Sequence, residues 1–136
     1  MEKQAEFIDF FNALPDWQER YRYIIELGEK LPKMPDCLKT PANRLSNCPS
    51  RMFFHVSRSP VINIQADGNS PISLGLAGIL AFIFNGLPAE QFNSEDVIFL
   101  FKTGLISNLS TQRQEALKEM LRKLEQGQRI KKSENI

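Results

Sequence analysis

Cys48 is the residue with the clearest capacity for chemistry in this chain. It stands in the polar turn Ser46–Ser50, just before an apolar run that begins at Met52. A structural cysteine is usually a small hydrophobic residue inside a regular element, whereas this turn, with Pro49 after the cysteine, presents the sulfur to another molecule. Because the thiolate is the nucleophile and access controls its reactivity, Cys48 is the candidate nucleophile.

The chain lacks the other parts of a complete thiol site. Zinc sites bring ligands in close pairs such as C-x2-C, but ten and six residues separate Cys37, Cys48 and His55, so we expect no metal site built by this chain alone. His55 is predicted to lie on a strand at the sheet surface, pointing away from the turn of Cys48. Glu95 and Asp96 stand at a helix start, where acids favour the dipole, and are interpreted as capping residues. A nucleophile without base, metal or cofactor suggests chemistry completed by a partner protein.

Composition indicates one ordinary globular domain. The chain has 136 residues, of which 42% are hydrophobic and 24% charged, enough for a single core. A net charge of +1 gives no attraction to nucleic acid or a membrane surface. The basic residues near the C-terminus alternate with glutamates and lack aromatic neighbours, which favours a solvated helix face; they are Lys118, Arg122, Lys123, Arg129, Lys131 and Lys132.

The N-terminal residues lack the basic start and apolar run of a signal peptide, and the apolar stretch Leu74 to Phe84 is too short to span a bilayer. We therefore expect a cytoplasmic protein whose thiols are kept reduced. Cys37 and Cys48 are then independent thiols.

The elements that must position Cys48 begin with two helices. The first, Glu2 to Ala13, ends before Pro15 and is predicted to gather Phe7, Phe10, Phe11 and Leu14 on one side. Asp16, with Glu19 three residues later, is predicted to cap an amphipathic helix that runs to about Leu31, with Trp17 and Tyr21 packed in the core. The proline-rich segment Pro32 to Pro49 is predicted to be an irregular, functional loop that leads to Cys48.

A hairpin follows the loop. Met52, Phe54 and Val56 alternate with Phe53, His55 and Ser57, and Ile62, Ile64 and Ala66 alternate with polar residues after the turn Ser59-Pro60. An isolated hairpin is marginal, so helices must cover it.

The remaining segments supply those helices. Ser70 or Ser73 caps a central helix from Ile72 to Phe84, which is apolar nearly all round and therefore buried. A short helix after Asn93 carries Val97, Ile98, Leu100 and Phe101. A last amphipathic helix is predicted from Ser110 to Gly127, with a frayed polar tail after it. The fold class is α+β, a small antiparallel sheet with helices packed on one side.

The chain resembles the SufE/CsdE family of sulfur-acceptor proteins from about Phe7 to Leu124. Four segments carry the resemblance: Trp17–Gly28 with Leu31-Pro32, Lys39–Ser50, Gln65–Asp67 into Gly75-Leu76, and Leu109–Arg113. The chain departs from the family at Asn47, where glycine is usual, and at Met52-Phe53, where a Val-Trp pair is favoured. Asn tolerates the left-handed backbone and both strand residues stay apolar, so the substitutions concern partner choice more than fold.

The resemblance implies a SufE/IscU-like fold, with one domain over residues 1–128 and a polar tail over 129–136. It also implies that Cys48 accepts sulfur from the persulfide of a cysteine desulfurase of the SufS or CsdA type, stimulates that enzyme, and passes the sulfur to an iron–sulfur scaffold of the SufBCD type. The protein is then a carrier and no enzyme; it holds no cofactor, because the pyridoxal phosphate belongs to the desulfurase. A monomer or weak homodimer is expected, with no nucleic-acid partner.

Family positions near the acceptor cysteine fall on Asn43, Asn47, Ser50, Asp67 and Arg113. Arg113 would favour the Cys48 thiolate and Asp67 would disfavour it. Cys37 matches no acceptor position and is interpreted as a bystander thiol.

Two alternatives stay open. In one, the protein activates a desulfurase non-covalently and Cys48 is dispensable; in the other, Cys48 is a redox sensor oxidised without a partner. For the carrier, Cys48 is predicted to rest partly sheltered in an apolar pocket, because an exposed persulfide is lost to reductants.

Overall fold

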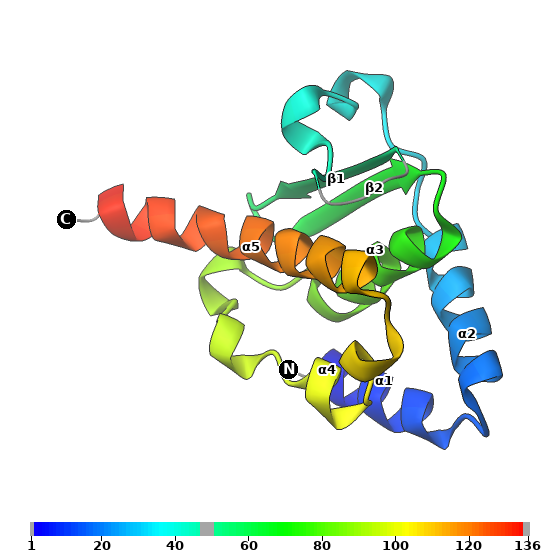
Figure 1. Ribbon diagram of the computed structural model, residues 1–136. Helices are drawn as coiled ribbons and strands as arrows, with labels where there is room; N and C mark the ends of the chain where they lie inside the picture. The colour runs from blue at the N-terminus through cyan, green and yellow to red at the C-terminus, as the bar shows by residue number, and fades with distance from the viewer. Residues whose placement is uncertain (1, 47–50, 135–136) are drawn as a thin grey trace.

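The computed structural model places a two-stranded antiparallel sheet over a layer of helices (Figure 1). It describes residues 2–46 and 51–134, and side chains as far as residue 125. Strand β1 (Met52–Ser57) pairs with β2 (Asn63–Gly68), so that Met52 lies opposite Gly68 and Phe54 opposite Ala66. The predicted hairpin is confirmed, and so is the α+β class with a small antiparallel sheet.

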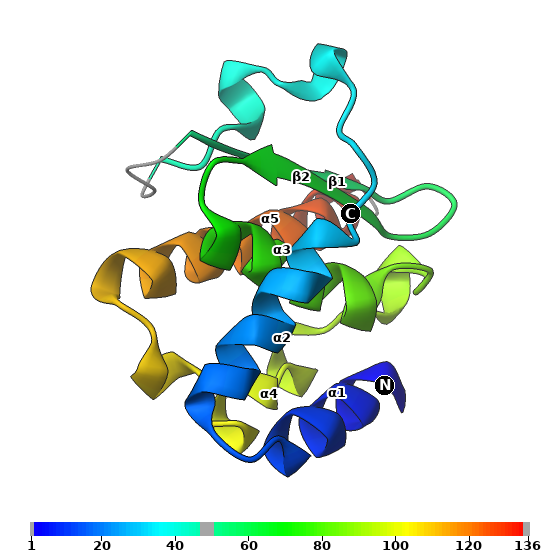
Figure 2. The same ribbon diagram turned by 90° about the vertical axis from the view of Figure 1, so that its right-hand side faces the viewer.

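Helices α3 (Pro71–Phe84) and α5 (Thr111–Glu134) lie against the same face of the hairpin (Figure 2). The Ser70 side chain caps α3 by accepting a hydrogen bond from the Ser73 amide, 3.3 Å away. Most of α3 is buried because it packs against β2, α2 and α5 at once. The prediction of a central buried helix is therefore confirmed.

Helix α2 (Trp17–Glu29) crosses α3 at a point where the two backbones touch. Gly28, Gly75 and Gly78 meet there, and a Cβ built on Gly78 would lie 2.5 Å from the carbonyl oxygen of Leu27. A Cβ on Gly75 would collide with the carbonyl oxygen of Ile24. Glycine is therefore required at this crossing by the close approach of the two helices.

Helix α1 (Glu2–Ala13) joins α2 through aromatic rings, with Phe7 stacked on Tyr23 and Phe11 edge-on to Trp17. The Asp16 carboxylate caps α2 by accepting from the Glu19 amide at 2.9 Å, as predicted. Arg20 then donates from Nε to the Phe11 carbonyl at 3.1 Å and so closes the end of α1. Phe7 and Phe11 are buried, but Phe10 is 52% exposed and lies against the Tyr23 ring.

The region after α3 has less α-helix than expected. It holds two 3₁₀ turns, η3 (Ala89–Gln91) and η4 (Ser94–Asp96), and one short helix, α4 (Phe99–Lys102). The buried Gln4 side chain sets this geometry, since its amide donates to the Asp96 carbonyl and its oxygen accepts from the amides of Ile98 and Phe99. The helix therefore begins only at Phe99, and Phe101 is 77% exposed.

The covering segment, residues 32–46, lies over the far face of the sheet (Figure 2). It carries two 3₁₀ turns, η1 (Asp36–Leu38) and η2 (Pro41–Asn43), and is otherwise irregular, as predicted for its described part. Phe53, which alternates with Phe54 along β1, is also buried, at 6% exposure. Leu45, also buried, belongs to the same covering segment.

Helix α5 is longer than its sequence suggests. The predicted cap is present, because the Arg113 amide donates to Ser110 Oγ at 3.3 Å. The helix continues through Gly127 to Glu134, where an end at Gly127 and a frayed tail were predicted. A glycine inside a helix costs only about 1 kcal/mol, which the adjacent helix-forming residues offset.

Candidate functional site

Three of the predicted site residues, Asn47, Cys48 and Ser50, lie outside the described residues, as does the predicted apolar shelter around the thiol. The site is therefore defined by the groups that hold the chain on either side of residues 47–50. These groups come from η2, both strands and α5.

Main-chain pairing closes the base of this segment. The amide of Leu45 donates to the carbonyl of Met52 at 2.9 Å, and Arg44 and Phe53 form an isolated antiparallel bridge. The Asn69 amide donates to the Arg51 carbonyl at 3.1 Å, which ties the exit of the segment to the end of β2. The chain therefore leaves a hydrogen-bonded backbone frame after residue 46 and rejoins it at residue 51.

Glu119 of α5 binds Ser46, the last described residue before residues 47–50, in a contact termed the Ser46 clasp. Its carboxylate accepts from the Ser46 amide at 3.1 and 3.2 Å and from Ser46 Oγ at 3.1 Å. Hydrogen bonds to a charged acceptor are stronger than neutral ones. Sequence reasoning missed this contact because its partners are 73 positions apart and Glu119 was interpreted only as part of a solvated helix face.

A cluster of charges joins the covering segment to β2. Lys39 lies 3.0 Å from a carboxylate oxygen of Asp67 and 3.0 Å from one of Asp36. The hydrogen bonds that Lys39 donates to Asp67 and, less strongly, to Asp36 raise the pKa of Lys39, and the same bond to Asp36 lowers the pKa of that carboxyl. Asp67 is therefore neutralised by Lys39, a residue that the sequence did not single out.

Asn43 and His55 meet across the sheet edge. His55 Nδ1 lies 3.3 Å from Asn43 Oδ1, and Asn43 Nδ2 donates to the Leu38 carbonyl at 2.7 Å. Because Asn43 Oδ1 only accepts, His55 Nδ1 carries the proton in this pair. His55 lies on β1, which confirms its place on a strand, but it is half-buried and meets Asn43 of the preceding loop, so the prediction that it points away from that loop is wrong.

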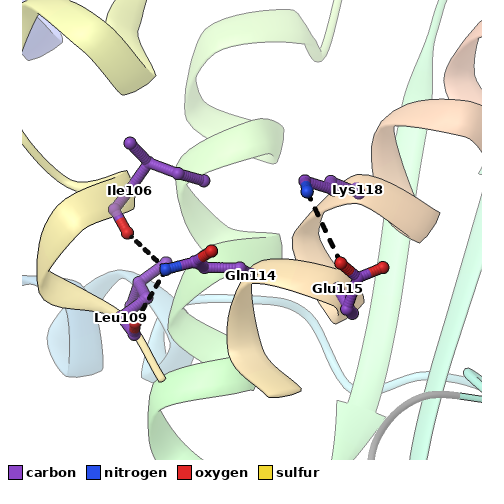
Figure 3. Close-up of polar contacts among 5 residues, drawn as sticks. All are labelled: Ile106, Leu109, Gln114, Glu115 and Lys118. Atoms are coloured by element: carbon purple, nitrogen blue, oxygen red, sulfur yellow. Dashed lines mark hydrogen bonds and ion pairs between the residues drawn. The ribbon is translucent and has the colours of Figure 1, made fainter. Parts of the chain in front are cut away.

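Arg113 lies on the first turn of α5, which is anchored by its neighbour Gln114. Gln114 Nε2 donates to the carbonyls of Ile106 at 2.8 Å and Leu109 at 2.9 Å (Figure 3), the first of them in the 3₁₀ turn η5 (Ile106–Asn108). The Arg113 side chain is exposed and forms no ion pair with any described residue. It is six positions before Glu119, about 9 Å along the helix axis.

The three predicted residues that the structure describes, Asn43, Asp67 and Arg113, share no hydrogen bond or ion pair with one another. Asn43 contacts His55 and Asp67 contacts Lys39, while Arg113 stands apart on α5. Neither the covering segment nor the hairpin brings together a described group of three metal-ligating side chains.

A family model described as the SufE Fe-S metabolism associated domain matches residues 5–128. This chain belongs to the SufE family. An uncharacterized SufE-like protein of Rhizobium etli is 33% identical over 132 residues, which cover 93% of this chain and 89% of that protein. A second, from Rhizobium meliloti, is 35% identical over 125 residues, covering 88% of this chain and 89% of that protein.

A solved structure has the same fold. The solution structure of a hypothetical protein from Thermus thermophilus matches with a TM-score of 0.67 and 19% identity, over 91% of this chain and 94% of that one. SufE membership places the chain in iron–sulfur metabolism. In the described part of the chain, each helix is too short or too polar to cross a bilayer.

Proposed function

We propose that this protein accepts sulfur on Cys48 from a cysteine desulfurase and relays it to an iron–sulfur scaffold. What supports the proposal is SufE membership over residues 5–128 together with the place of Cys48 in the chain, on a short segment between the Ser46 clasp and the start of β1. The protein acts as a carrier that also stimulates the desulfurase, which alone holds the pyridoxal phosphate.

The transfer is a thiol exchange. The Cys48 thiolate attacks the outer sulfur of the donor persulfide, a new S–S bond forms, and the donor cysteine leaves as a thiolate. No electrons are gained or lost overall. The same step with Cys48 as the donor delivers sulfur to the scaffold.

Intact mass spectrometry tests the acceptor. The protein is incubated with a desulfurase, pyridoxal phosphate and L-cysteine, and its mass is expected to rise by one sulfur atom. The gain should vanish in Cys48→Ser and persist in Cys37→Ser, since Cys37 is the exposed thiol of the described residues and a matched control. If Cys48→Ser still stimulates the desulfurase but gains no mass, the protein is a non-covalent activator and not a sulfur carrier. A thiol oxidised by peroxide, with no sulfur taken from the desulfurase, would indicate a redox sensor.

The charges near the segment should tune the thiol. Arg113 favours a nearby thiolate and Asp67 opposes it. In a Cys37→Ser background, Arg113→Gln is expected to slow alkylation of Cys48 by iodoacetamide at pH 7, and Asp67→Asn to accelerate it. Lys118→Gln, which removes an exposed charge that pairs with Glu115 on the same helix, is the control and should leave the rate unchanged. Equal alkylation rates in all three variants would show that Arg113 and Asp67 do not influence the Cys48 thiol.

A further inference from the structure

A small pocket beside the hairpin contains two basic side chains, Arg58 and Lys123, which do not take part in the contacts to Ser46. Its volume is about 140 Å³, and its lining comes from η2, β1 with the residue after it, and α5. The lining residues are Asn43, Phe54, His55, Val56, Arg58 and Lys123. None of them is acidic.

Arg58 is held in this pocket with part of its hydrogen-bonding capacity unused. One terminal nitrogen, Nη2, donates to the Lys123 carbonyl. Its Nε is buried and has no hydrogen-bond partner among the described residues. An unpaired buried donor on a cation is costly, and because Arg58 as a whole is only partly buried, the rest of its side chain stays open to an acceptor.

The charge of the pocket is also unbalanced. Arg58 and Lys123 form no ion pair with any described carboxylate, and burial lowers the pKa of the Arg58 guanidinium. Lys123 Nζ donates to the Ala42 carbonyl at 2.9 Å, which leaves two of its three protons for another acceptor. A water molecule could occupy the pocket, but only an anion also compensates the charge.

We infer that this pocket binds a small oxyanion of the phosphate or carboxylate kind, held by the Arg58 guanidinium and Lys123 Nζ beside the ring of His55. Arginine and lysine together recognise such groups through charge-assisted hydrogen bonds. The proposed sulfur transfer does not require Arg58 or Lys123. It adds a ligand whose binding links η2, β1 and α5 to one another.

The occupant would act on the same chain segment as the Ser46 clasp. Lys123 is one helical turn beyond Glu119, about 6 Å along α5, and it holds Ala42 as Glu119 holds Ser46. An anion between Lys123 and Arg58 therefore fixes η2 against α5. A bound ligand also stabilises the folded protein by mass action.

His55 provides the readout, because it is the only histidine in the chain. Sodium phosphate and sodium acetate are titrated separately into the full-length protein at constant ionic strength, with chloride as the balancing anion, and the imidazole resonances of His55 are followed by NMR. We expect a saturable shift with a millimolar dissociation constant for at least one of the two anions. Tighter binding of phosphate would mark the pocket as a phosphate site, and tighter binding of acetate as a carboxylate site.

Lys123→Gln is expected to weaken binding about tenfold, which corresponds to roughly 1.4 kcal/mol, and Arg58→Gln by at least as much. Arg22→Gln is the matched control, because it removes an equal charge from the exposed pair with Glu19 on α2 and should change nothing. If Arg58→Gln does not fold, Lys123→Gln still decides the matter. Resonances that respond to chloride as they do to phosphate and acetate, or equal affinities in Lys123→Gln and the native protein, would overturn the inference.

Discussion

The α2–α3 crossing and the frame around residues 47–50 are built in opposite ways. At the crossing, glycines bring two helix backbones into direct contact, and a single added methyl group has no space. In the frame, hydrogen bonds and ion pairs such as Ser46–Glu119 and Lys39–Asp67 join segments far apart in the chain, most of them at exposed or half-exposed atoms. Close packing allows one arrangement, whereas exposed polar contacts exchange with water at a small net cost. The molecule thus separates the part that fixes the fold from the part that holds the segment carrying Cys48.

The largest effect is expected from breaking the crossing. Gly75→Ala places a methyl group against the Ile24 carbonyl and should lower the free energy of unfolding by about 3 kcal/mol or more, at the upper end of overpacking costs. Urea denaturation measures this loss. Gly86→Ala is the control: nothing lies within 4 Å of its Cβ, but its φ of +88° should cost about 1 kcal/mol. Equal losses in the two variants would contradict the close approach of α2 and α3.

A smaller loss of stability is expected at Gly68, where a close backbone contact adjoins the frame around residues 47–50. Gly68 ends β2 opposite Met52, and a Cβ there would lie 2.5 Å from the Arg51 carbonyl oxygen. The Met52 side chain can move aside. The backbone of Arg51 can do so only if the chain shifts at the point where it follows residues 47–50. Gly68→Ala should therefore destabilise the protein by about 1–2 kcal/mol and slow sulfur uptake by Cys48. Normal uptake by a protein with that loss of stability would show that the exit geometry is unimportant.

Removing the clasp should change the frame without changing the fold. Glu119→Gln replaces a charged acceptor of Ser46 with a neutral one, so the Ser46 amide should exchange with solvent about tenfold faster, equivalent to roughly 1.4 kcal/mol of local stability. The urea midpoint should hardly move. Glu115→Gln, one turn earlier on α5 and paired with Lys118 of the same helix, should leave exchange at Ser46 unaltered. Unchanged exchange in Glu119→Gln would show that the clasp contributes nothing.

The smallest effect concerns the charge cluster and depends on pH. The pKa of Asp36 is lowered in the folded protein, so its contribution to stability is present above the unfolded value and is lost as the pH falls through the folded value. The pKa of Lys39 is raised, so its contribution is present below the ordinary value of 10.5 and is lost as the pH rises through the folded value. Lys39→Met should therefore lower the urea midpoint slightly at pH 7 and by less at pH 3. A difference of the same size at both pH values would exclude the ion pairs as its cause.

Local patterns in the sequence predicted the regular elements well. Asp16, Ser70 and Ser110 cap the helices they were expected to cap, since a cap depends on residues three positions apart. The alternation along β1 and β2 likewise predicted the hairpin. These signals are local, so neighbouring residues were sufficient to find them.

Contacts between distant segments were not predictable in this way. Phe53 is buried because the segment before it folds back over the sheet, and Phe101 is exposed because Gln4 delays the start of α4. The Ser46–Glu119 clasp has no local signature at all. At the site, the sequence indicated Cys48 and its family environment, but not the groups that hold the chain on either side of it.

The two contacts between α5 and the covering segment have a mechanical consequence. Ala42 is held by Lys123 and Ser46 by Glu119, so the segment runs antiparallel to the helix with its two attachments one turn apart. A force along the segment loads both attachments at once, in shear. A force that lifts the chain away from α5 at Ser46 loads them one after the other, as in peeling. A partner that draws residues 47–50 outward therefore meets the Glu119 contact first, while the Lys123 contact still holds the rest of the segment in place.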